Sequence, residues 1–145
     1  AAFMSHFSLW SMCYEQQEEF TIFEHDAIVV NHIPRHIPYK EVISIGKPSY
    51  GGHIDLKSFG VNPLTSKRYF PGAHAYRLRP AGAKKLIDQA KICAKPTDIY
   101  LNLDTFPNLQ EYYPWPVEAK DTFTTIQKRQ GCLAKHNYDE TYKII

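Results

Sequence analysis

The sequence predicts an α/β fold, in which a mixed sheet is flanked by helices. Amphipathic helical segments alternate along the chain with short apolar, β-branched runs, the arrangement that packs helices on a sheet. The chain has 145 residues, 43% of them hydrophobic, which is enough for one domain with a real core. We therefore expect a single domain over residues 1–145, with a polar and peripheral tail from about residue 127.

The first half of the chain predicts a helix followed by short strands. A helix is expected over residues 2–19, because apolar residues recur there at three- and four-residue steps. Residues 21–23 have the composition of a strand, and residues 27–30 continue it or form a second short strand. Residues 31–38 contain two prolines and are expected to form a loop, ahead of a buried strand at 42–45.

The middle of the chain predicts a long loop, a strand and a helix. Residues 49–71 are rich in Gly and Pro and show little periodicity, so we expect a long irregular segment with a binding role. Residues 72–79 alternate as a strand does. A helix is expected over residues 81–94, because Pro80 suits its first turn.

The last third of the chain is predicted less regular. Residues 99–103 show a short apolar alternation, and residues 122–126 are β-prone. Residues 108–116 are expected to form an aromatic loop punctuated by prolines. Its Trp115, with two neighbouring tyrosines, is either a stacking platform for a sugar ring or ordinary loop packing.

Composition narrows the classes of function. The net charge is +2 and no Lys/Arg stripe is present, so no nucleic-acid partner is expected. No apolar run approaches the roughly 20 residues that span a bilayer. Cys13, Cys93 and Cys132 are far apart and odd in number, which favours free thiols in a reducing compartment, the cytoplasm.

Two acidic residues, Glu24 and Asp26, lie inside the most apolar stretch of the chain. Burying a charge there is costly unless it is paired or coordinated, and ligands of open α/β sheets bind at the carboxyl ends of strands. Two such carboxylates can divide the binding of a hard divalent cation and of sugar or ribose hydroxyls. Strict alternation would put His25 on the opposite face, or His25 is a softer ligand that favours Mn²⁺. The alternative is a surface turn.

Further candidate residues lie elsewhere. Asp98 follows a proline and is a candidate general base or orienting group, or else an ordinary turn residue. His6 lies at the edge of the buried stripe of the first helix. His74 and Tyr76 share a strand face, where they line a cleft or belong to the core.

Several of these pieces, in this order, resemble glycosyltransferase family 25, which includes lipooligosaccharide and collagen galactosyltransferases. The family carries a Ser-His-xxx-Trp-type helix followed by a strand ending in Glu-Asp-Asp. His25 stands here in place of the middle acid, and the family's opening β-α unit is not found ahead of the helix. The similar pieces are Ser5-His6 to Trp10, Ile22 to Ala27, Gly72-Ala73-His74-Ala75-Tyr76, Gly82-Ala83 to Leu86, Pro96-Thr97-Asp98, and Pro116 with Thr124-Thr125-Ile126.

The resemblance implies a GT-A-like (Rossmann-like) sheet, N-terminally truncated, and a role such as lipopolysaccharide biosynthesis. If active, the domain would transfer a hexose, galactose being usual, from a UDP-hexose to a glycan or protein acceptor, with Mn²⁺ or Mg²⁺. The alternative is a non-catalytic, degenerate transferase domain that binds glycans or a partner. The implied roles are metal and donor binding for Glu24 and Asp26, catalysis at the acceptor for Asp98, and donor or acceptor binding for His6, His25, His74, Tyr76 and Trp115.

Overall fold

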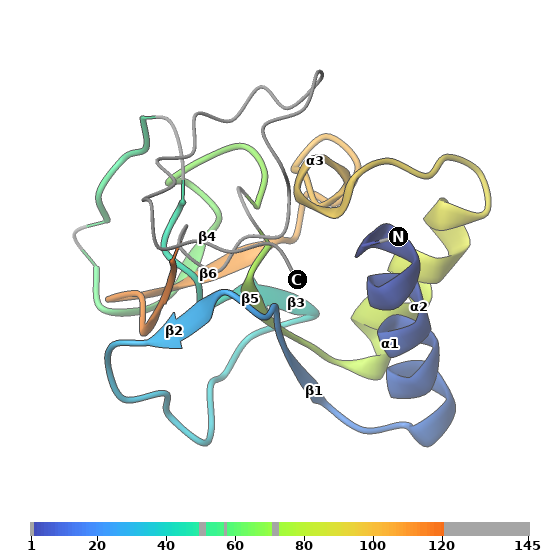
Figure 1. The fold of residues 1–145 in the computed structure, drawn as a ribbon, viewed down its shortest axis with the longest axis horizontal. Helices are drawn as coiled ribbons and strands as arrows, with labels where there is room; N and C mark the ends of the chain where they lie inside the picture. The colour runs from blue at the N-terminus through green and yellow to red at the C-terminus, as the bar shows by residue number, and fades with distance from the viewer. Residues whose placement is uncertain (1, 50–51, 57, 71–72, 121–145) are drawn as a thin grey trace, which may run out of the picture.

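A five-stranded mixed sheet, with helices packed on it, organises the computed structural model, which describes residues 2–49, 52–56, 58–70 and 73–120 (Figure 1). The predicted fold class, a mixed α/β sheet with flanking helices, is confirmed. The helices are α1 (Ala2–Gln16), α2 (Pro80–Ala90) and α3 (Thr97–Tyr100). The strands are β1 (Phe20–Phe23), β2 (Ala27–Val29), β3 (Val42–Ser44), β4 (Gly60–Pro63), β5 (Ala75–Leu78), β6 (Gln110–Tyr113) and β7 (Val117–Ala119).

The strand order in the main sheet is β1-β5-β3-β6-β4. β5 runs antiparallel to both β1 and β3, while β3 and β6 are parallel and β4 pairs antiparallel with β6. β2 and β7 form a separate antiparallel pair. Figure 1 shows this pair beside the main sheet, away from α1 and α2.

Both faces of β5 are covered, so all four of its residues are buried. On one face, Tyr76 and Leu78 pack with Trp10 and Cys13 of α1 and with Leu86 of α2. On the other face, a second cluster lies under the loop that follows β2 and against β7; it contains Ile37, Tyr39, Ile43, Ile45, Ala75 and Val117. Because β5 is covered on both faces, the side chains that alternate along it are buried on both sides, and neither face is exposed.

The first helix forms as its periodicity predicts. His6, Trp10 and Cys13 are buried on one side of α1, at four- and three-residue steps. The helix ends at Gln16, earlier than expected, and Gln17 adopts the left-handed conformation that commonly terminates helices (φ 56°). The predicted strands at 21–23 and 42–45, the short strand after residue 26 and the helix that begins at Pro80 are also confirmed.

Three predicted segments differ in the structure. The expected loop over residues 108–116 contains β6, an inner strand, and the irregular stretch 49–71 contains β4, its edge neighbour. The short apolar alternation at 99–103 does not form a named strand: its first residues belong to α3, one helical turn, and Leu101 N donates to Thr97 O (3.0 Å). The β-prone segment 122–126 and the tail from 127 lie outside the described residues.

β6 carries a buried carboxylate, Glu111, that contacts outside the strand satisfy. Its Oε1 accepts hydrogen bonds from the backbone N–H groups of Thr65 (2.7 Å) and Ser66 (2.8 Å), and its Oε2 accepts one from Ser66 Oγ (2.5 Å). These donors come from the loop after β4, far away in sequence. A buried carboxylate in an inner strand is tolerated because its acceptor oxygens are satisfied.

The described part of the chain contains no helix that is long and apolar enough to cross a membrane.

Gly82 is where α2 approaches the sheet most closely, and the Gly82→Ala variant tests this packing. An added Cβ would lie 2.5 Å from Glu41 O and 2.9 Å from Val42 Cγ2. That carbonyl is held in place, because it also accepts a hydrogen bond from Arg79 N (2.9 Å). We expect the free energy of unfolding to fall by about 1–2 kcal/mol, although alanine favours a helix by up to about 1 kcal/mol.

Urea denaturation measures this loss. The Ala81→Gly variant, at the exposed neighbouring position, measures how much helix propensity alone changes the free energy of unfolding in α2. A Gly82→Ala protein that is more stable than wild type would contradict the close packing.

Candidate functional site

The two acids that the sequence analysis singled out lie at the carboxyl end of β1. Glu24 N donates to His74 O (2.9 Å), and Ala27 N donates to Glu24 O (3.1 Å). The second bond closes a tight turn through residues 25 and 26, from which the chain enters β2. The predicted position at a strand end is therefore confirmed. Strict strand alternation does not continue past Phe23, because the chain turns there.

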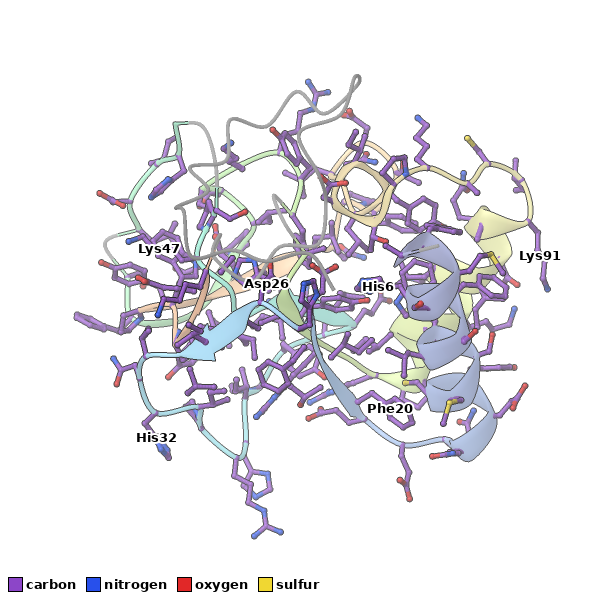
Figure 2. The ribbon with its side chains drawn as sticks, in the orientation of Figure 1. His6, Phe20, Asp26, His32, Lys47 and Lys91 are labelled. Atoms are coloured by element: carbon purple, nitrogen blue, oxygen red, sulfur yellow. The ribbon has the colours of Figure 1, made fainter. Side chains whose placement is uncertain are left out.

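Glu24 is held by a buried histidine. His6 Nε2 lies 2.9 Å from Glu24 Oε1, and the side chains of the two residues are 5% and 28% exposed. His6 Nδ1 lies 2.7 Å from the Tyr76 hydroxyl, and the two rings stack at 5.7 Å. Figure 2 shows His6 on the side of α1 that faces the sheet. His6 thus engages one carboxylate oxygen of Glu24, while the Glu24 side chain remains partly open to solvent.

Asp26 has an unsatisfied oxygen atom. Its Oδ1 is buried and has no hydrogen-bond partner among the described residues. Its backbone carbonyl accepts a hydrogen bond from Lys120 N (2.9 Å), which ties the turn to the end of β7. Leaving a buried polar atom unpaired costs about 1–3 kcal/mol, so this oxygen is a candidate ligand atom for a bound group.

His74 lies beside the two acids. It is 2% exposed, and neither ring nitrogen has a hydrogen-bond partner among the described residues. Burial lowers the pKa of His74, and the nearby carboxylates of Asp26 and Glu24 oppose this effect without reversing it. The ring packs directly on Gly46, where a Cβ atom would lie 2.5 Å from His74 Nε2. His74 is therefore a buried neighbour of the two acids with a lowered pKa.

A metal ion can be tested against these residues. Across the described ranges, no group of three or more His, Cys, Asp or Glu side chains is arranged to hold a metal ion. Mg²⁺ commonly takes only one or two protein carboxylates and completes its shell with water and substrate phosphates. The unpaired oxygen of Asp26 next to Glu24 fits an ion that arrives with a diphosphate, and does not fit an ion held by protein ligands alone.

The structure brings together five of the predicted site residues and places the other three differently. His6, Glu24 and Tyr76 are joined by hydrogen bonds, and Asp26 and His74 interact electrostatically next to them. His25 is exposed in the turn, and Asp98 lies half-buried in α3. Trp115 is 9% exposed and contacts the rings of His53 (5.5 Å) and Tyr113 (5.1 Å) edge-on. The binding and catalytic roles of these residues stay predictions.

Two residues of the site were not recognised from the sequence. Trp10 was assigned only to the buried stripe of α1, yet its Nε1 donates to the Tyr76 hydroxyl (2.8 Å). Its spacing of four residues from His6 was the available signal, because such residues share a helix face. Gly46, which follows the predicted strand at 42–45, carries no sign in the sequence that His74 packs on it.

The comparison with protein families bears on this part of the molecule. The model of glycosyltransferase family 25 (LPS biosynthesis protein) matches residues 1–42. The matched stretch contains α1, β1 and β2 with both acids, so the resemblance noted from the sequence is confirmed there. No curated protein matches the chain.

The buried neutral state of His74 predicts a pH dependence of stability. Because the folded-state pKa of His74 is lowered, the unfolded chain binds more protons below the ordinary histidine pKa of about 6.5. Stability is then fully present above this pH and falls as the pH drops below it, by at most about 1.4 kcal/mol per pH unit from this one group.

Urea denaturation of the metal-free protein between pH 7.5 and 5 measures this effect. His74→Gln should remove the additional acid sensitivity, and His32→Gln, in an exposed loop, is the matched control. Equal slopes for wild type and His74→Gln would show that His74 is not held neutral in the fold.

Proposed function

We propose that this chain is a glycosyltransferase domain that transfers a hexose, galactose in the first instance, from a UDP-hexose to a glycan or protein acceptor, with Mn²⁺ or Mg²⁺. The observation that carries the proposal is the unpaired, buried Oδ1 of Asp26 next to the half-exposed carboxylate of Glu24. The family match over residues 1–42, which includes both acids, supports it. A GT-A-like arrangement of the sheet is part of the same proposal.

The two carboxylates divide the binding of the donor. Asp26 holds the divalent cation, because its Oδ1 has no competing partner in the described part of the chain. Glu24 has one oxygen engaged by His6, so its other oxygen accepts a hydrogen bond from a ribose or sugar hydroxyl. When bound, the cation neutralises negative charge on the diphosphate leaving group.

The transfer itself needs one further group at the acceptor. The acceptor hydroxyl oxygen forms a bond to the anomeric carbon, and the bond from that carbon to the diphosphate oxygen breaks, with its electron pair leaving on UDP. The proton of the hydroxyl passes to a carboxylate, for which Asp98 is the candidate. Asp98 belongs to α3, a separate element from the turn that carries Glu24 and Asp26.

Calorimetric titration with UDP in the presence of Mn²⁺ tests the donor site. Wild type should bind UDP only when Mn²⁺ is present. Asp26→Asn should lose this binding because the negatively charged carboxylate becomes a neutral amide. Asp55→Asn is the matched control, because the Asp55 side chain is 82% exposed in another loop. Saturation at 10 to 100 times Kd should stabilise the wild type by roughly 1.4–2.7 kcal/mol.

Two results would count against this assignment. The first is UDP binding that does not depend on Mn²⁺, and the second is equal binding by wild type and Asp26→Asn. If wild type binds neither UDP nor Mn²⁺, the domain is a non-catalytic relative of the transferases.

A further inference from the structure

A continuous chain of hydrogen bonds runs from Trp10, in the core between the sheet and the helices α1 and α2, to Glu24. Trp10 Nε1 donates to the Tyr76 hydroxyl (2.8 Å). The same hydroxyl lies 2.7 Å from His6 Nδ1, and His6 Nε2 lies 2.9 Å from Glu24 Oε1. The four side chains come from α1, β5 and the end of β1, so the chain joins three elements at the candidate site.

The donors and acceptors in this chain fix its direction. An indole N–H can only donate, so the Tyr76 oxygen accepts from Trp10. Burial raises the pKa of Tyr76, which keeps its hydroxyl protonated and able to donate to His6 Nδ1. At the other end of the ring, an ionised carboxylate can only accept, so His6 Nε2 carries the proton that is donated to Glu24.

Packing holds each member of the chain in one rotamer. Trp10 and Tyr76 are fully buried and His6 is 4% exposed. The Trp10 ring stacks on Tyr100 of α3 (5.5 Å), and His6 stacks on Tyr76 (5.7 Å). His6 and Trp10 lie one turn apart on α1 and therefore approach the same hydroxyl. The orientation of the Nε2–H bond is fixed by the core and not by Glu24 alone.

We infer that Trp10, Tyr76 and His6 are positioning residues that hold the Glu24 carboxylate in one orientation for the donor. This inference rests on the proposed function, because it assumes that Glu24 contacts the donor. Phenylalanine and leucine could fill the same space if these side chains served only the stability of the core, and no polar groups would then be buried. The chain instead ends at the one member that is open to solvent, the Glu24 side chain at 28% exposure.

Partners of this kind, which orient a group that binds a ligand, typically change metal affinity or activity 10- to 100-fold when they are removed. Tyr76→Phe keeps the ring and removes only the hydroxyl. We therefore expect UDP binding in the presence of Mn²⁺ to weaken by about tenfold.

Tyr100→Phe is the matched control. It also removes a hydroxyl from a buried tyrosine of the same core, one that donates to Leu86 O (2.5 Å) and lies outside the chain. It should lose stability without a change in UDP affinity. His6→Gln should bind UDP more tightly than His6→Ala, because a glutamine amide can replace the Nε2–H donor.

A readout without ligand separates this inference from the proposed function. Nitrogen NMR of the ligand-free wild type reports the His6 tautomer, with His6→Gln providing the assignment, and should show the proton on Nε2. A proton on Nδ1 would overturn the inference, as would equal UDP affinities for Tyr76→Phe and Tyr100→Phe. Failure of the proposed function is recognised separately, as the absence of Mn²⁺-dependent UDP binding by wild type and Tyr100→Phe alike.

Discussion

The Tyr76 hydroxyl joins the helical core to the candidate site. It accepts from Trp10 and lies against His6, so one oxygen atom satisfies two buried nitrogen atoms of α1 and fixes that helix against β5. Without the hydroxyl, both nitrogens would be buried and unpaired, at a cost of about 1–3 kcal/mol each. The same contact sets the His6 ring and, through it, the carboxylate of Glu24. The packing of α1 on β5 and the geometry of the site therefore both depend on the contacts of the Tyr76 hydroxyl.

The acids lie where the main sheet meets the two-stranded β2–β7 sheet. Glu24 N donates to His74 O, the residue directly before β5 of the main sheet, and Lys120 N, just past β7, donates to Asp26 O. The short turn from Glu24 to Asp26 is therefore tied to both sheets. Beside it lie the buried oxygen of Asp26 and the two ring nitrogens of His74 that have no partner among the described residues.

Local patterns predicted the part of the fold that depends on local contacts. Apolar residues at three- and four-residue steps identified α1, and the β-branched run before Glu24 identified β1 and the position of the acids. β6 was not predicted, because the prolines of residues 108–116 favoured a loop. What the strand depends on is not local: the donors that satisfy its buried Glu111 lie about 45 residues away in the sequence. The close contact of Gly46 with His74 was equally hidden, because it joins the residues just past β3 and just before β5, which are far apart in the sequence. The family match over residues 1–42 covers α1, β1 and β2, while β3 and α2 were predicted from local patterns alone.

In the proposed site, Asp26 binds a divalent cation together with a diphosphate while His6 holds Glu24 beside it. A crystal structure with Mn²⁺ and UDP, with data collected at the manganese absorption edge, tests this arrangement. We expect an anomalous peak within coordination distance of an Asp26 carboxylate oxygen, with the His6–Glu24 hydrogen bond intact. An anomalous peak elsewhere, with Asp26 still unliganded in a UDP-bound protein, would contradict it.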